Sequence, residues 1–138
     1  MVNAQAARSQ IVGGVIVGIG HALLEDNPLE LDTGRLAASN LADYMVPVNA
    51  DIPVIDVQFI DRPDPVVNGL GARGVGELGT VGSAAAVGNA IYNATGIRVR
   101  DLPITLDKLL RAAGTPLCAV RYVKYPYRVM ISLAWNSA

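Results

Sequence analysis

The residue with the clearest chemical potential in this chain is Glu77, a carboxylate placed within a cluster of glycines. Gly74 and Gly76 precede it and Gly79 follows it, in the run GLGARGVGELGT over residues 69–80. Because glycine costs backbone entropy wherever it is ordered, this cluster indicates unusual backbone dihedrals or a backbone pressed against another group. An acid walled by glycines in a dry pocket could act as a general base. The alternative is a solvated glutamate near a helix N-terminus.

The same glycines allow a second interpretation. Gly74, Gly76 and Gly79 match the G-x-G-x-x-G pattern of dinucleotide-binding loops. That fold requires a strand directly before the first glycine. Proline and glycine residues interrupt the stretch before Gly74, and the best strand pattern ends near Ile60. A dinucleotide-binding module is therefore the weaker alternative.

Metal and thiol chemistry have little support in the sequence. His21 is the only histidine and Cys118 is the only cysteine. A lone histidine without a second one at helical spacing is weak evidence for a metal site, so we expect no metal ligand among the side chains. A single cysteine excludes an internal disulfide and an iron–sulfur cluster built from this chain alone.

Length and charge limit the classes of protein further. The chain has 138 residues, 51% of them hydrophobic, and a formal net charge of -1. These values suit one domain or part of a larger one. The charge gives no electrostatic footprint for nucleic acid or an anionic membrane. The longest apolar run, residues 11–24, falls short of the roughly 20 residues that span a bilayer, so we expect no membrane segment.

Two glycine-rich helices are expected to position the loop. The first covers residues 3–25, with Asn3 as its cap, and the second follows the loop and ends at Gly96 in the left-handed conformation. Each interior glycine costs about 1 kcal/mol relative to alanine, so these helices must be buried and closely packed. A functional alternative is that the N-terminal end of the first helix approaches a cofactor, with Gln10 as a polar contact.

The remaining predicted elements are short. They are a hairpin of residues 29–31 and 35–37, strands at 54–60 and 97–100, and a helix at 106–113 that Thr105 caps and Gly114 ends. The sequence thus predicts an α+β fold, with two buried glycine-rich helices on a small mixed or antiparallel sheet. We place the main unit at residues 1–114. Residues 115–138 differ in residue pattern from the rest of the chain and form either an extra strand or a foreign tail from a shifted reading frame.

The loop GARGVGE that ends at Glu77 resembles the G-x-K-G-x-G-E loop of the molybdenum hydroxylases, the xanthine dehydrogenase and aldehyde oxidase family. The resemblance covers roughly residues 2–110 and is strongest to bacterial aldehyde oxidases with a separate molybdenum subunit. The other segments that carry it are ARSQIVGGVIVGIGHAL (7–23), NLADYMVP (40–47), AAAVGNAI (84–91) and LPIT (102–105).

This resemblance implies roles for four residues. Glu77 would lie beside molybdenum and act as the general base in hydroxylation of aldehydes or N-heteroaromatics, with water as the oxygen source. Gln10 would contact the pterin, and Gly74 and Gly76 would let the backbone approach the metal centre. Arg73 stands where the family's loop usually has lysine, and because the two cations bond differently no role is carried over to it.

The resemblance also implies partners. The chain would be the C-terminal part of a longer molybdopterin-binding subunit, and its cofactor would be molybdopterin in the cytosine dinucleotide form. Iron–sulfur clusters and FAD would lie on other domains or subunits. The isolated chain would then be inactive. A different class of function stays open: a non-catalytic α+β module that self-associates into a homo-oligomer through exposed apolar surface.

Overall fold

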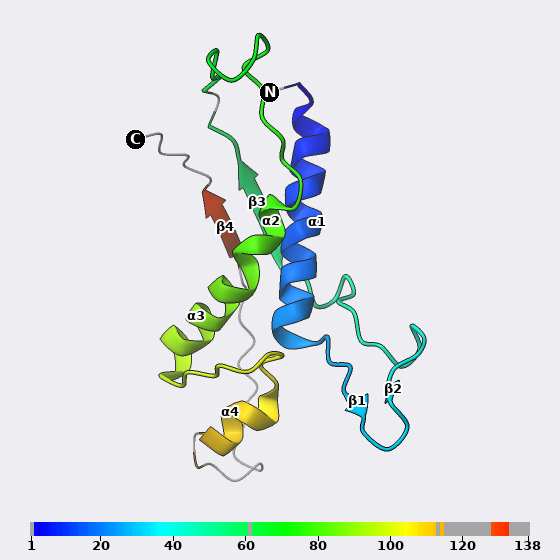
Figure 1. The fold of residues 1–138 in the computed structure, drawn as a ribbon. Helices are drawn as coiled ribbons and strands as arrows, with labels where there is room; N and C mark the ends of the chain where they lie inside the picture. Colours follow the sequence, from blue (N-terminus) through cyan, green and yellow to red (C-terminus); the bar gives the residue numbers. More distant parts are fainter. Residues whose placement is uncertain (1, 61, 113, 115–127, 133–138) are drawn as a thin grey trace.

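The structure, a computed structural model, describes residues 2–60, 62–112, 114 and 128–132, the last group by its backbone. A long helix, α1 (Ala4–Leu23), forms the axis of the molecule (Figure 1). Strand β3 (Val54–Gln58) and helices α2 (Leu78–Val81) and α3 (Ser83–Thr95) pack against it. The other elements are β1 (Leu29–Glu30), β2 (Arg35–Leu36), α4 (Leu106–Ala112) and β4 (Arg128–Ser132).

Helix α1 begins and packs as the sequence predicts. The Asn3 side chain accepts a hydrogen bond from the Ala6 amide at 2.9 Å, which confirms the cap. The core is a cluster of Ile11, Val15 and Ile19 with Ile55 of β3. By length and composition alone α1 is apolar enough to cross a membrane, in contrast to the expectation from the apolar run. Its apolar character is accounted for by this core.

The close packing of α1 rests on a glycine seam, formed by Gly14 and Gly18 of α1 with Gly79 and Ser83. A Cβ atom at Gly14 would lie 2.9 Å from the Gly79 Cα and from the Thr80 nitrogen, and one at Gly18 would collide with the Ser83 Cβ. Ser83 is itself buried, and its hydroxyl donates to the Gly79 carbonyl at 2.5 Å. Gly14 and Gly18 therefore offset their poor helix propensity by close helix contact, as predicted, whereas a Cβ atom at Gly13 would meet nothing within 4 Å.

The second glycine-rich helix is present but divided. It breaks at Gly82 into α2 and α3, and it ends at Gly96 with φ +73, which confirms the left-handed cap. The α+β class is confirmed, but fewer residues of this helix are buried than expected. Ser83 is the only buried residue of α3, because α3 diverges from α1 after its first turn (Figure 1).

The strands form two separate two-stranded sheets, one antiparallel and one parallel. Strands β1 and β2 form the predicted antiparallel hairpin, with Leu29 opposite Leu36. Strand β3 pairs in parallel with β4, with Val54 opposite Arg128. Strand β4 lies within residues 115–138, so part of that segment adds a strand to the main unit. The rest of that segment lies outside the described residues.

The stretch after α3 differs from its prediction. Residues 97–100 form no strand, because Arg98 turns back onto α3, where it stacks on the Tyr92 ring at 3.9 Å and donates to Asn89 at 2.8 Å. The chain then returns to α1, where the Ile104 amide donates to the Ala22 carbonyl at 2.6 Å. Helix α4 follows at the predicted place, and Gly114 ends it with φ +62.

Candidate functional site

Glu77 lies at the N-terminus of α2, directly before the glycine seam. Its carbonyl accepts the Thr80 amide at 2.9 Å, so its backbone is part of the first turn of the helix. Its side chain is exposed and makes no capping bond, and no other hydrogen bond or ion pair reaches it from the described residues. The carboxylate is therefore accessible, on a backbone that is fixed.

The two glycines before Glu77 leave open space above the backbone. A Cβ atom at Gly74 or Gly76 would have no neighbour within 4 Å, and Gly76 has φ +41. Packing among the described residues therefore does not require glycine at these two positions, in contrast to Gly14 and Gly79. Open space at these positions leaves the backbone accessible to another group.

Gln10 lies at the same end of the seam as Glu77. Gly14 faces Gly79 and Gly18 faces Ser83, so both contacts keep the same offset along the two segments. Gln10 lies one turn before Gly14 on α1, and Glu77 lies two residues before Gly79, so both residues precede the seam in the chain. Figure 1 shows that loop running alongside the N-terminal half of α1 down to α2. Gln10 is exposed, as Glu77 is.

The described residues do not form the dry pocket expected around Glu77. Glu77, Gly74 and Gly76 are all exposed. Among the described residues, the seam covers the face of α2 that meets α1, and nothing covers the side of the loop that carries the carboxylate. Further protein or a ligand would be needed to exclude water from it.

Sequence reasoning missed the residues that shape the loop. Arg73 forms an ion pair with Asp64, and the Arg73 guanidinium holds the pKa of Asp64 below its usual value. Asn68 accepts the amides of Leu70 and Ala72, both at 3.1 Å. Aspartate and asparagine favour such bonds to nearby backbone, so the Asp-Pro and Asn-Gly pairs in this stretch were the available signal.

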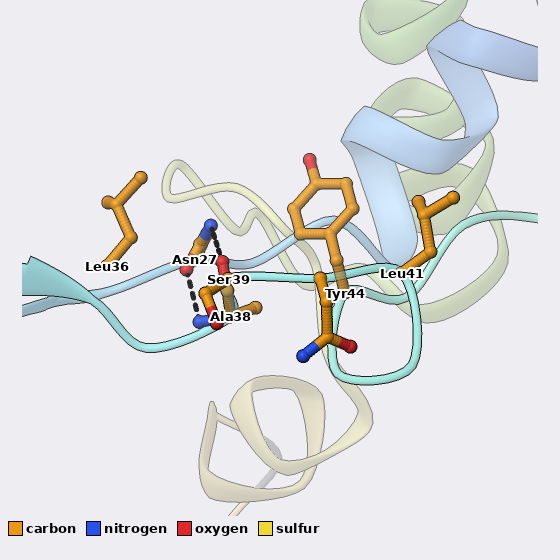
Figure 2. Close-up of a pocket in the computed structure, with 7 residues that line it drawn as sticks. Asn27, Leu36, Ala38, Ser39, Leu41 and Tyr44 are labelled. Atoms are coloured by element: carbon orange, nitrogen blue, oxygen red, sulfur yellow. Dashed lines mark hydrogen bonds between the residues drawn. The ribbon is translucent and has the colours of Figure 1, made fainter.

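A second feature lies at the opposite end of α1. An open hollow of about 450 Å³ is lined by residues of the 27–44 stretch (Figure 2). At this hollow the Asn27 side chain makes two hydrogen bonds, of 2.8 and 3.0 Å, to the Ala38 backbone. Beside it the Tyr44 hydroxyl donates to Glu25 at 2.7 Å, which raises the pKa of Tyr44. These bonds join the 38–44 stretch to residues 25 and 27, in the segment that follows α1.

His21 takes part in that same contact, 3.5 Å from the Glu25 carboxylate. Across the part of the chain that the structure describes, no three histidine, cysteine or acidic side chains gather as metal ligands. The dinucleotide alternative also fails on geometry. The dinucleotide-binding fold requires a strand directly before Gly74, and residues 62–77 contain no strand.

Comparison with known proteins decides the family. Residues 1–53 match the family described as molybdopterin cofactor-binding domain. The chain is 51% identical over 110 residues to the aldehyde oxidoreductase molybdenum-binding subunit PaoC of Escherichia coli K12, an alignment that covers 80% of the chain. The chain belongs to the molybdenum hydroxylase family. It is also 36% identical over 113 residues, 81% of its length, to a probable xanthine dehydrogenase subunit of Bacillus subtilis.

Solved structures agree with this assignment. Quinoline 2-oxidoreductase from Pseudomonas putida 86 superposes with a TM-score of 0.73 and 32% identity over 83% of the chain. A Cu,Mo-CO dehydrogenase shares the fold, with a TM-score of 0.68 and 21% identity over 81% of the chain. The chain spans only about 14–15% of the length of each of these proteins. It therefore corresponds to a fragment of a molybdenum hydroxylase large subunit.

The residues at this end of the seam fit a molybdopterin. Gly74 and Gly76 offer open backbone without side chains, and Gln10 offers both an amide donor and a carbonyl acceptor. Glu77 adds an ionisable acceptor with no partner among the described residues. Such a set suits a polar heterocycle that binds close to the main chain.

Proposed function

We propose that this chain supplies the general base of a molybdenum-dependent hydroxylase, and that Glu77 is that base. The supporting observation is the position of Glu77: an accessible carboxylate without a partner among the described residues, on a backbone held by the glycine seam. A base must reach the proton it accepts and keep its orientation while doing so. In this role a Glu77 carboxylate oxygen takes up a proton during oxidation of the substrate.

The cofactor would be held by Gln10, Gly74 and Gly76. The Gln10 amide would bond to the pterin, and the two glycines would let the main chain lie against it. When bound, molybdopterin supplies molybdenum as the two-electron acceptor that hydroxylation of a carbon atom needs. We propose the cytosine dinucleotide form, with iron–sulfur clusters and FAD on other domains or subunits.

The names of the relatives support a proposal for the substrate class. PaoC belongs to an aldehyde oxidoreductase. A protein of Pseudomonas putida KT2440 that is 38% identical over 115 residues is named as part of a nicotinate dehydrogenase. We propose that the complete enzyme oxidises an aldehyde or an N-heteroaromatic compound. The remainder of the large subunit would form the walls that Glu77 lacks here, so the isolated chain would be inactive.

The test compares the chain alone with the chain in a complete subunit. The purified 138-residue chain is expected to hold no molybdenum and to oxidise no aldehyde. A chimera, in which the 110 matched residues replace the corresponding segment of E. coli PaoC, is expected to load molybdenum and oxidise aldehydes. Full activity of the isolated chain would contradict the proposal that it holds only part of the site. A folded chimera without molybdenum would contradict the proposed cofactor-binding role.

A second candidate function, self-association, has its own support. Several large apolar side chains are more than four-fifths exposed, namely Val66, Leu31, Val81, Leu41 and Leu70. Where such side chains form a contiguous exposed apolar patch, association is favoured. In a complete subunit the same side chains would be available for contact with the rest of the protein, so this behaviour would belong to the isolated chain.

A further inference from the structure

Strand β3 has a neighbour along only one of its edges among the described strands. β4 pairs with it in parallel over its whole length, from Val54 opposite Arg128 to Gln58 opposite Ser132. Figure 1 shows β4 on the side of β3 away from α1. The other described strands, β1 and β2, form a separate sheet. The edge that β4 occupies is therefore the edge at which a wider sheet would continue.

The residue pattern of β3 is unusual for a strand in a parallel pair. Ile55 is buried in the core beside α1, and Val57 packs against the same cluster. Val54 and Gln58, at the two ends of the strand, are exposed. Alternation with one solvated face is typical of antiparallel strands, whereas parallel strands are usually apolar on both faces and covered on both sides. β4 therefore has the features of a substitute neighbour.

β4 also lies outside the part of the chain that resembles the molybdenum hydroxylases. The motifs that carry the resemblance end with LPIT at residues 102–105, and β4 begins at Arg128. The chain spans only about 15% of the length of PaoC. A complete large subunit therefore has ample further chain from which another strand could reach β3.

We propose that the edge of β3 is a docking site for an extended segment of the remainder of the large subunit, and that β4 occupies this site in the isolated chain. Main-chain hydrogen bonds along the edge would hold either segment, so only one of them can pair there at a time. The identity of the partner rests on the proposed function, in which this chain is one piece of a molybdenum-dependent hydroxylase.

The test asks whether β4 lies beside β3 in the isolated chain and in a complete subunit. Val54→Cys and Arg128→Cys place thiols at two register partners, and Cys118→Ser removes the only native thiol of this chain. Neighbouring strands lie about 4.8 Å apart, so dibromobimane, a short reagent that joins two nearby thiols, should link this pair. In the isolated 138-residue chain we expect most molecules to be linked, as measured by peptide mass spectrometry.

The complete subunit is a chimera in which the whole chain replaces its matching segment of E. coli PaoC. There the linked fraction should fall by about tenfold or more, because β4 is displaced from the edge in most molecules. The matched control is Leu29→Cys with Leu36→Cys, the partners in the β1–β2 hairpin, which should link equally in both proteins. Equal linking of the Val54–Arg128 pair in both proteins, or none in the isolated chain, would overturn the proposal.

Hydrogen exchange of unmodified PaoC keeps the test decisive if the chimera fails to fold. Every second amide of β3 points toward the edge that β4 occupies. The same amides in the matching segment of PaoC should exchange slowly, because a strand of PaoC would pair with them. Fast exchange at those amides would show an unpaired edge and overturn the proposal. None of these measurements needs turnover or bound molybdenum, so their outcomes are separate from the assignment of Glu77 as base.

Discussion

Gly14 and Gly79 meet backbone to backbone where α1 crosses α2, so that a Cβ atom on Gly14 would lie 2.9 Å from the Gly79 Cα. Glu77 is two residues from this contact. An exposed loop that enters a helix can usually shift with the first turn of that helix. Here the first turn of α2 is held against α1, and this contact fixes the backbone from which the carboxylate projects.

The seam predicts opposite effects for two glycine substitutions. Gly79→Ala would press a methyl group into the Ile11 carbonyl and should lower the free energy of unfolding by about 1–3 kcal/mol. Gly13→Ala is the matched control, because a Cβ atom there meets nothing within 4 Å and the helix gains about 1 kcal/mol in propensity. Urea unfolding followed by circular dichroism measures both. Equal effects of the same sign would contradict the seam.

The end of α3 gives a second prediction about glycine. Gly96 has φ +73, so Gly96→Ala should cost about 1–2 kcal/mol in unfolding free energy. Gly88→Ala, inside the same helix and with only an ordinary contact to Ile104 at 3.6 Å, should be neutral or stabilising. Thermal unfolding of the two variants side by side is sufficient, and a Gly96→Ala variant as stable as the wild type would refute the left-handed cap.

The loop should respond to acid through Asp64. Its pKa in the folded chain is lowered from 3.8, chiefly by the hydrogen bond from Arg73. A lowered pKa means that the ion pair contributes above the ordinary value and is lost as the pH falls through the lower, folded value. NMR shifts of the Leu70 and Ala72 amides should therefore stay constant from pH 7 to about 5 and change with a midpoint below 3.8. In Arg73→Gln the midpoint should move upward, and a wild-type midpoint above 3.8 would be inconsistent with the ion pair.

The exposed apolar side chains predict association of the isolated chain. Light scattering after size-exclusion chromatography should show species larger than the monomer, with a fraction that rises with protein concentration. Replacing Val66 and Leu70 by serine should reduce that fraction, because both side chains are more than four-fifths exposed and neither belongs to the core. A strictly monomeric wild-type chain would exclude self-association as a function.

Local signals predicted much of the fold. Asn3, Gly96 and Gly114 are caps and stops whose chemistry acts within one helical turn, and each lies at its predicted position. The hairpin of β1 and β2 followed in the same way from its turn residues. The strand expected at 97–100 was wrong because Arg98 binds back to Tyr92 and Asn89, a contact that no local pattern encodes.

The sequence indicated which residues belong to the candidate site, but it did not indicate what surrounds them. Glycines around Glu77 indicated unusual backbone dihedrals or a backbone pressed against another group; Gly76 has φ +41, and a Cβ atom at Gly74 or Gly76 would meet nothing within 4 Å. The expected dry pocket required elements on both sides of the loop, and the chain provides one side. The pairing of Asp64 with Arg73 closes a turn across several residues, so it was visible only once the loop had a shape.

The most direct test of the central claim is aldehyde turnover by the PaoC chimera carrying Glu77→Gln, with molybdenum content measured on the same sample. If Glu77 is the proton acceptor, turnover should fall by about 100-fold or more while molybdenum stays bound. Glu30→Gln in the exposed hairpin is the matched control and should keep the turnover of the parent chimera. A Glu77→Gln chimera that retains both molybdenum and near-parental turnover would contradict the assignment.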